Sequence, residues 1–225
     1  MLTIYGSDLS APAIKVRLTA SFLGVKHKWQ IVNLREGEQK QEWYLKINPV
    51  GKVPAIDDDG FHLFESNAIC RYLCDKHNSA LYPKDVKKRA TIDQWIDYAS
   101  FHIGANFMPV VYNRLFAPLR GIPVNEKAIT DGLGFLKQYF PIIEKQLTQH
   151  KYIVSQEMSL ADIILLALLE PAGKAQIDLS VYPKLNAWRS DLKKQSFYTS
   201  CYKEYGEMLA SPSGGSKPSV RDSHA

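Results

Sequence analysis

Two hydrophobic periods alternate over the first 78 residues, and this alternation restricts the folds open to the chain. Short apolar runs, which are typical of strands, cover residues 2–5, 29–33, 53–57 and 61–64. Helical periodicity covers residues 13–23, 41–47 and 66–77. The sequence Asp-Asp-Gly separates the last two strands and predicts a hairpin. Because a strand, a helix and a second strand in succession favour a right-handed parallel unit, we predict a small α/β domain with the order βαβαββα.

From Val86 onward strand signals nearly vanish, and long helical patterns replace them. These patterns cover residues 86–114, 125–149, 159–169, 184–194 and 197–209. Residues 1–78 match the thioredoxin-like plan, and we expect a linker at 79–85 and an all-α domain at 86–210. Residues 211–225 are predicted to be a disordered tail. Two such domains form a cleft between them, and domain interfaces are preferred ligand sites.

The composition is that of a globular protein with a modest positive charge. The 225 residues are 45% hydrophobic, which suffices for two domains with their own cores, and the net charge is +5. The densest basic run, residues 84–89, has the spacing of a solvated first helical turn. A nucleic-acid surface would need a larger basic face with interleaved aromatic residues. We therefore expect no nucleic-acid partner and favour a small anionic ligand.

Neither a membrane segment nor a metal site or disulfide framework is predicted. The longest apolar run, residues 163–169, is far too short to cross a bilayer, and Met1 leads directly into a strand pattern. The three cysteines form no CxxC spacing. Cys70 and Cys74 can form a pair of metal ligands, but no histidine or carboxylate completes the set, so buried thiols are the preferred interpretation. We expect a cytoplasmic protein without a metal ion.

Four stretches resemble one known family when they are taken together and in order. They are Ser10-Ala-Pro12, then LREGEQKQEWYLKINPVGKVPAIDDDGFHLFESNAICRYL, then LYPKDVKKRATIDQW, and finally MSLADIILLALLEP. This series is similar to that of the cytosolic glutathione transferases, and within them to the serine-type group with its theta, phi and insect delta classes. The resemblance covers residues 1–209.

The resemblance implies the family's activity and partners. It implies glutathione as co-substrate, conjugation of its thiol to a small apolar electrophile, and a homodimer. Because the same thiolate can attack a peroxide oxygen or a halogenated carbon, glutathione-dependent peroxidase or dehalogenase activity is an alternative. A non-catalytic member of the fold, which only binds ligands or proteins, is a further alternative. The retention of Ser10, Val53-Pro54 and Glu65-Ser66 argues against it.

Ser10 stands where the first strand gives way to a helix, and the resemblance implies that it is the catalytic residue. The glutathione thiol, like that of free cysteine, has a pKa of about 8.5, so holding the thiolate at neutral pH takes roughly 2 kcal/mol. A serine hydroxyl at a helix N-terminus can donate a hydrogen bond to the sulfur, and the helix amides add positive potential. A cysteine there would form a mixed disulfide, so serine favours conjugation over disulfide reduction.

Two other interpretations of this region stay open. Ser10 can act only as the N-cap of the first helix. Tyr5, at the end of the first strand, can be the thiolate donor, because the tyrosine-type glutathione transferases use a tyrosine in that region. The spacing from Tyr5 to Arg17 is one residue longer than in those classes, whereas Ser10 aligns without a shift, so we prefer Ser10.

The resemblance assigns a set of further residues to glutathione binding: Gln39, Lys52, Val53, Pro54, Glu65 and Ser66. The family has a cis bond before this proline, which turns the main chain of Val53 outward, where it can pair with the cysteinyl unit as an added strand does. A trans proline at the start of an edge strand is the alternative. Most X-Pro bonds are trans, so the cis prediction comes from the resemblance alone.

The charged ends of glutathione are assigned in the same way. Taken alone, Ser66 is an N-cap and Glu65 an exposed acid. In the family, helix amides and the Ser66 hydroxyl face the γ-glutamyl carboxylate, and Glu65 takes its ammonium group. Gln39 and Lys52 face the glycyl carboxylate, with solvated surface side chains as the alternative. Asn67 replaces an arginine found in many relatives, which removes that arginine's charge.

Two features of the second domain complete the predictions. An apolar stripe near the end of the first long helix borders the second substrate in the family, and plain core is the alternative interpretation. Its members are Phe107, Met108, Val111, Tyr112 and Phe116. The sequence Ser159-Leu-Ala-Asp162 predicts a capping box before an apolar run, with a purely structural role.

Overall fold

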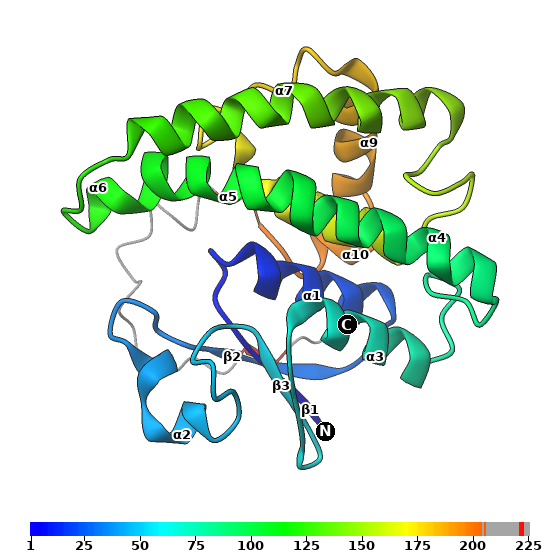
Figure 1. Ribbon diagram of the computed structural model, residues 1–225. Coiled ribbons are helices and arrows are strands. Elements are labelled where there is room, and N and C mark those ends of the chain that lie inside the picture. Colours follow the sequence, from blue (N-terminus) through cyan, green and yellow to red (C-terminus); the bar gives the residue numbers. More distant parts are fainter. Residues whose placement is uncertain (204, 206–220, 223–225) are drawn as a thin grey trace. The chain divides into compact units, whose positions relative to one another are not determined.

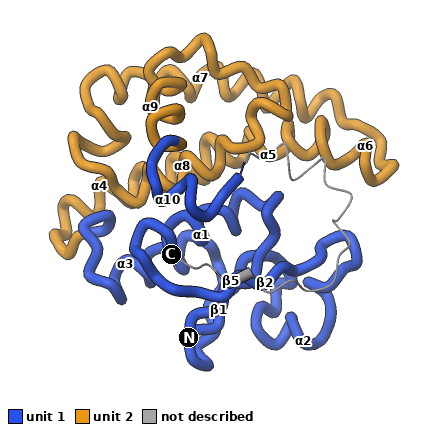
Figure 2. The backbone as a smooth tube through the Cα atoms, turned by 180° about the vertical axis from the view of Figure 1, so that it is seen from behind, with its two compact units in different colours: residues 1–82, 194–225 blue, residues 83–193 orange. Residues whose placement is uncertain are grey.

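A computed structural model describes residues 1–203, 205 and 221–222 of the protein. The chain divides into two compact units, Met1–Tyr82 together with the residues from Lys194 onward, and Pro83–Lys193 (Figure 2). The sequence predicted residues 194–210 in the helical domain, whereas the described residues from Lys194 onward belong to the α/β unit. The predicted disordered tail lies outside the described residues except for Arg221 and Asp222.

A mixed sheet forms the centre of the first unit (Figure 1). Its main strands are β1 (Leu2–Gly6), β2 (His27–Ile31), β3 (Ala55–Asp58) and β4 (Phe61–Phe64). β1 is parallel to β2, and β3 is antiparallel to both β1 and β4, which confirms the predicted parallel unit and hairpin. A two-residue strand, β5 (Arg221–Asp222), pairs with β2 where the sequence predicted disorder.

The helices of this unit are α1 (Ala11–Phe22), α2 (Glu42–Leu45), α3 (Ser66–Lys76) and α10 (Ser196–Thr199), with a 3-10 turn η1 (Glu38–Lys40). α1 and α3 pack against each other over one face of the sheet (Figure 1). Alternate residues of a strand point to opposite faces, so Ile4 is fully buried while Tyr5 packs against Tyr44 of α2. The sheet therefore has a core on each face.

The cysteines of α3 belong to this core. Cys70 and Cys74 are free and buried, as the preferred interpretation predicted. Burial raises the pKa of both thiols, so neither is a reactive thiolate at neutral pH. Thr19 of α1 donates a hydrogen bond to the Cys70 sulfur at 3.4 Å. These thiols help to hold α1 against α3.

The second unit consists of helices: α4 (Val86–Asp97), α5 (Ala105–Val111), α6 (Ala117–Leu119), α7 (Glu126–Gln149), α8 (Leu160–Leu168), α9 (Pro183–Lys193) and a 3-10 turn η4 (Glu170–Ala172). Two π-helical segments, η2 (Tyr98–Gly104) and η3 (Tyr112–Phe116), interrupt the helix predicted over 86–114. Pro109 lies inside α5 just before the second segment, and the Asn113 side chain donates to its carbonyl oxygen at 2.9 Å. A proline lacks the backbone donor that a regular helix needs, which accounts for a local change of period.

Helices α5 and α7 approach each other closely at Gly132. A Cβ atom at this position would lie 2.6 Å from the backbone oxygen of Asn106 and 2.7 Å from a methyl group of Val110. Only glycine permits this contact without a backbone shift. The contact fixes the face of α5 that is turned toward α7.

The last predicted helix is shorter than expected. The pattern over residues 197–209 predicted three turns, but α10 contains only Ser196–Thr199. Residues 206–209 lie outside the described residues. The apolar residues Phe197 and Tyr198 are buried, so the pattern reports burial of this segment correctly although it overestimates the helix.

Helix α8 runs through the core of the second unit and begins at the predicted capping box. Residues Leu160–Ala167 are all buried. The Asp162 carboxylate, itself fully buried, accepts hydrogen bonds from the Ser159 N–H and hydroxyl, the Ile153 N–H and the Trp188 indole N–H at 2.8 to 3.0 Å. No helix among the described residues is long and apolar enough to cross a membrane.

Replacement of Asp162 by alanine is expected to destabilise the fold strongly. The substitution leaves several buried donors without an acceptor, and each costs about 1–3 kcal/mol, so we expect a loss of at least about 3 kcal/mol in the free energy of unfolding. Urea unfolding of the Asp162→Ala variant measures this. Asp131→Ala is the control, because Asp131 forms an exposed ion pair with Lys127 whose loss costs about 1 kcal/mol or less. Equal effects of the two substitutions would contradict the prediction.

Candidate functional site

Ser10 is the N-cap of α1, as the sequence predicted. Its backbone is extended, with φ −102° and ψ 106°, and its carbonyl oxygen accepts from the amides of Ala13 and Ile14 at 2.8 Å. The side-chain oxygen accepts from the Ala13 amide at 3.4 Å. This cap uses the hydroxyl only as an acceptor, so its hydrogen remains able to donate to a ligand. The structural and the catalytic interpretations of Ser10 are therefore compatible.

The loop before Ser10 is held by close packing and a largely buried ion pair. A Cβ atom on Gly6 would lie 2.3 Å from the Trp29 ring, so the end of β1 requires glycine. The Asp8 carboxylate pairs with Arg17 of α1 at 2.8 Å, and the two side chains are only 10% and 17% exposed. The Arg17 guanidinium also lies 4.8 Å from the centroid of the Trp29 ring. These contacts restrict the conformation of the loop.

Tyr5, the alternative thiolate donor, packs within an aromatic cluster. Its ring lies 6.2 Å from those of Trp43 and Tyr44. Burial, and to a smaller extent the charge of Asp57, raises the pKa of its phenol above the ordinary value. The raised pKa keeps the Tyr5 phenol protonated, as a hydrogen-bond donor must be, so it does not distinguish Tyr5 from Ser10. The cluster accounts for this tyrosine as a packing residue.

The bond between Val53 and Pro54 is cis, which confirms the prediction from the resemblance. The carbonyl oxygen of the preceding residue, Lys52, accepts from the Tyr44 hydroxyl at 2.7 Å and from the Asn48 side chain at 2.6 Å. Both donors are buried, so they fix the backbone that leads into Val53. Within the described residues, neither the N–H nor the C=O of Val53 makes a hydrogen bond. Both groups can therefore pair with an extended peptide.

Helix α3 begins at Ser66, as predicted, but its N-cap is the preceding residue. Glu65, not Ser66, is the N-cap, because the Glu65 carbonyl oxygen accepts from the Ile69 amide at 2.9 Å and Ser66 already has helical geometry. Glu65 has a φ of 68°, a left-handed conformation that is costly for a residue with a side chain. The Glu65 side chain makes no capping hydrogen bond to this helix. A helix N-terminus favours a carboxylate ligand.

Lys15 is a charged residue beside the predicted site that the sequence analysis did not single out. Its ammonium group donates to the Asn67 side-chain oxygen at 2.7 Å and therefore lies beside the start of α3. Burial lowers its pKa, and the nearby Glu65 carboxylate counteracts part of this effect. The available signal was a lysine on a face of α1 whose neighbours, Ile14 and Leu18, are apolar and buried. Lys15 brings a positive charge to the position where Asn67 replaces an arginine.

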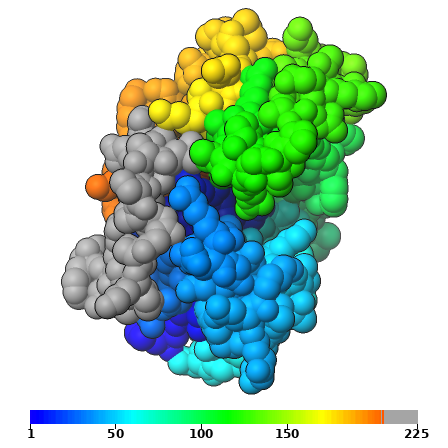
Figure 3. All heavy atoms as spheres, turned by 90° about the vertical axis from the view of Figure 1, so that its left-hand side faces the viewer, coloured from blue at the N-terminus to red at the C-terminus, as the bar shows by residue number. Residues whose placement is uncertain are grey.

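Gln39 and Lys52 differ in exposure. Gln39 lies in η1, and its side-chain oxygen is buried with no hydrogen-bond partner within the described residues. Rotation of the Gln39 side-chain amide by about 180° exchanges its oxygen and nitrogen, so that its NH₂ group can donate a hydrogen bond to a carboxylate. The Lys52 side chain is exposed. The segment that carries η1 and α2 forms part of the molecular surface, in mid-blue in Figure 3.

The five residues predicted to border the second substrate do not form one face. Phe107 and Val111 are completely buried in the helical core, which agrees with the plain-core alternative for these two. Met108, Tyr112 and Phe116 are half-buried and follow each other at intervals of four residues. The neighbouring helix α7 packs closely on α5, which explains why one side of the stripe belongs to the core. Only the three half-buried residues are accessible to a ligand.

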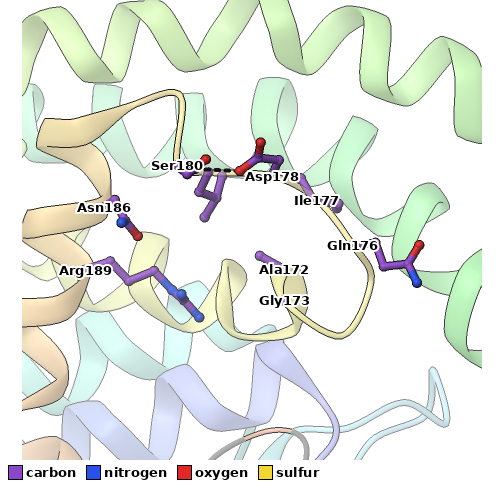
Figure 4. A pocket seen from close by; sticks show the side chains of 9 residues that line it. Ala172, Gly173, Gln176, Ile177, Asp178, Ser180, Asn186 and Arg189 are labelled. Carbon is purple, nitrogen blue, oxygen red and sulfur yellow. Dashed lines mark hydrogen bonds between the residues drawn. The ribbon is translucent and has the colours of Figure 1, made fainter.

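The second unit contains a separate open cavity of about 460 Å³. Its lining comes from residues 172–173 and 176–180 with Asn186 and Arg189 of α9 (Figure 4). The Asp178 carboxylate accepts from the Ser180 amide at 2.8 Å, which closes the turn at one side. None of the predicted site residues lines this cavity. It is therefore distinct from the site built around Ser10.

Family models match both parts of the chain. The model described as "Glutathione S-transferase, N-terminal domain" matches residues 9–76, and the one described as "Glutathione S-transferase, C-terminal domain" matches residues 107–195. The first match includes Ser10, Val53, Pro54 and Glu65. The second match includes the half-buried residues Met108, Tyr112 and Phe116 and the helix α8.

Similar proteins cover nearly the whole chain. Glutathione S-transferase F10 from Arabidopsis thaliana is 31% identical over 212 residues, which are 91% of this chain and 98% of the relative. The crystal structure of glutathione transferase F7 from Populus trichocarpa has a TM-score of 0.84 at 26% identity and covers 93% of this chain and 99% of the other. A delta-class glutathione transferase from Nilaparvata lugens has a TM-score of 0.82 at 29% identity, with coverages of 93% and 98%. From the motifs, the fold and these matches together, the chain belongs to the glutathione S-transferase family of enzymes.

Proposed function

We propose that the protein binds glutathione, holds its thiol as the thiolate and transfers it to a small apolar electrophile. The observation that carries the proposal is the position of Ser10, whose hydroxyl caps α1 as an acceptor and keeps its hydrogen for a ligand. The same compact unit contains the cis Val53–Pro54 bond and the start of α3. These features supply contacts for the cysteinyl and γ-glutamyl parts of the tripeptide.

In the proposed mechanism, Ser10 donates its hydrogen bond to the sulfur. The amides of the first turn of α1 add positive potential at the same end of the helix. Together they have to lower the pKa of the thiol from about 8.5 to 7 or below, which corresponds to roughly 2 kcal/mol. Because serine cannot form a disulfide with glutathione, the thiolate stays available to attack the electrophile. Bringing the two reactants together supplies the remaining acceleration.

The rest of glutathione is proposed to occupy the first unit as follows. The main chain of Val53, beside Pro54, pairs with the cysteinyl unit. The amides at the start of α3 and the Ser66 hydroxyl bind the γ-glutamyl carboxylate, while Glu65 binds the ammonium group. Gln39 and Lys52 bind the glycyl carboxylate. Lys15 contributes the positive charge beside Asn67, and the distance of 2.7 Å between these two side chains supports this assignment.

The electrophile is proposed to contact Met108, Tyr112 and Phe116, because these are the accessible members of the apolar stripe. Detoxification of electrophiles, a cytoplasmic location and a homodimer belong to the same proposal and rest on family membership. Exposed aromatic side chains of the second unit, Phe101 at 70% and Phe135 at 45%, provide apolar surface that a second copy would cover.

The Ser10→Ala variant tests the proposed mechanism. We expect the pKa of the bound glutathione thiol, titrated by ultraviolet absorbance, to lie well below about 8.5 in the wild type and to return toward that value in the variant. Loss of one donor to a developing or stable anion costs about 100-fold or more in kcat/KM. Tyr5→Phe serves as the matched control and is expected to leave the pKa unchanged. A low pKa that survives in Ser10→Ala but not in Tyr5→Phe would assign the role to Tyr5.

The Lys15→Met variant tests whether Lys15 contributes a positive charge to glutathione binding. A charge-assisted hydrogen bond contributes about 1.5–3 kcal/mol, so we expect glutathione to bind about 10- to 100-fold more weakly. Isothermal titration calorimetry with glutathione gives the dissociation constant. Lys46→Met is the control, since Lys46 forms only an exposed ion pair with Glu42 in the same unit. Unchanged affinity in Lys15→Met would refute a role for Lys15 in binding.

A further inference from the structure

The chain returns to the first unit after the helical unit ends. We call residues 194–203 together with Tyr205 the return segment. It packs on α1: the rings of Phe22 and Phe197 lie 5.5 Å apart, and the hydroxyl oxygens of Ser21 and Ser200 lie 3.2 Å apart. Figure 2 shows α10 in the colour of the first unit, beside α1. Sequence periodicity gave no indication of this location.

The return segment ends beside the loop that carries Ser10. Tyr205 is only 3% exposed, and its hydroxyl donates a hydrogen bond to the carbonyl oxygen of Leu9 at 3.0 Å. The two residues are 196 positions apart in the sequence. Burial strongly raises the pKa of the Tyr205 phenol, so the hydroxyl keeps its proton and acts as a donor throughout the neutral range.

The hydrogen bond from Tyr205 acts on Ser10 through the rigid peptide group that joins Leu9 to Ser10. The Leu9 carbonyl and the Ser10 N–H belong to the same planar peptide unit. The N–H side of this peptide group is also held, because the Ser10 N–H donates to the Ser7 carbonyl oxygen at 2.9 Å. The two hydrogen bonds at its ends restrict rotation of this plane and so restrict the backbone angle φ of Ser10. This angle sets the direction in which the Ser10 side chain leaves the backbone.

We propose that Tyr205 is a positioning residue for Ser10, so that the C-terminal return segment takes part in thiolate stabilisation. The inference rests on the proposed function of Ser10. Without the Tyr205 hydroxyl, one anchor of the Leu9–Ser10 peptide is lost, and the Ser10 hydroxyl spends less time in the direction that meets the sulfur. Tyr205 itself touches neither glutathione nor the electrophile in this proposal.

The test compares Tyr205→Phe with Tyr202→Phe in the full-length protein. Each substitution removes one hydroxyl from a buried tyrosine of the return segment, since Tyr202 is 6% exposed. The readouts are the pKa of the bound glutathione thiol and the pH profile of kcat/KM with an aromatic chloride as electrophile. For Tyr205→Phe we expect a raised thiol pKa, an acid limb moved to higher pH, and about a 5-fold loss of kcat/KM at neutral pH. The dissociation constant of glutathione is expected to stay the same, and Tyr202→Phe is expected to match the wild type.

Three outcomes separate the inference from the proposed function. If Ser10→Ala raises the thiol pKa and Tyr205→Phe does not, the inference is wrong and the function of Ser10 stands. If Ser10→Ala also has no effect, the proposed function fails with it. If Tyr202→Phe and Tyr205→Phe raise the pKa equally, the effect is general loosening of the segment and the inference is again wrong. Should Tyr205→Phe not fold, Tyr205→His shortens the reach to the Leu9 carbonyl and is expected to raise the thiol pKa in the same way.

Discussion

The ion pair between Arg17 and Asp8 is the interaction on which the candidate site depends most. It joins the loop after β1 to the helix that follows, and the same guanidinium lies 4.8 Å from the centroid of the Trp29 ring in β2. Because both side chains are largely buried, the pair is screened by salt much less than a surface pair. Gly6 lets the Trp29 ring approach the loop directly. Ser10 is thus presented by a backbone that packing and charge hold together.

The N-termini of α1 and α3 are capped differently, and the difference corresponds to their proposed roles. At α1 the Ser10 side chain satisfies an amide and keeps its hydrogen for a sulfur ligand. At α3 the N-cap residue Glu65 makes no side-chain capping hydrogen bond and adopts a left-handed backbone conformation. A ligand carboxylate is an acceptor that a helix N-terminus favours. Lys15 joins the two helices through Asn67 and so places a positive charge beside the start of α3.

Local patterns in the sequence predicted what depends on neighbours along the chain. The strands, the hairpin, the cap at Ser10 and the capping box at Asp162 are all of this kind. The cis bond before Pro54 came only from the resemblance, because nothing local distinguishes it from the usual trans bond. The start of α3 at Ser66 was predicted correctly, but its N-cap was placed one residue too late, since a serine at the helix start can be either the cap or the first helical residue.

What the sequence could not predict depends on contacts between distant segments. Phe107 and Val111 have the same chemistry as the accessible residues of the stripe, and only the approach of α7 at Gly132 separates core from surface. The role of Lys15 is visible only when Asn67, 52 positions later, lies beside it. Helical periodicity likewise describes how a segment is buried and not which unit buries it.

The return segment shows why the first compact unit is more than the first 82 residues of the chain. The order of the chain places Ser10, Val53 and Glu65 before Tyr82 and the whole helical unit after it. However, the carbonyl beside Ser10 receives its hydrogen bond from Tyr205, which follows the helical unit. A chain that ended at Tyr82 would contain all the proposed glutathione contacts and still lack one anchor of the Leu9–Ser10 peptide. In this fold, the geometry of the first loop is therefore completed only by the last described helix and the tyrosine that follows it.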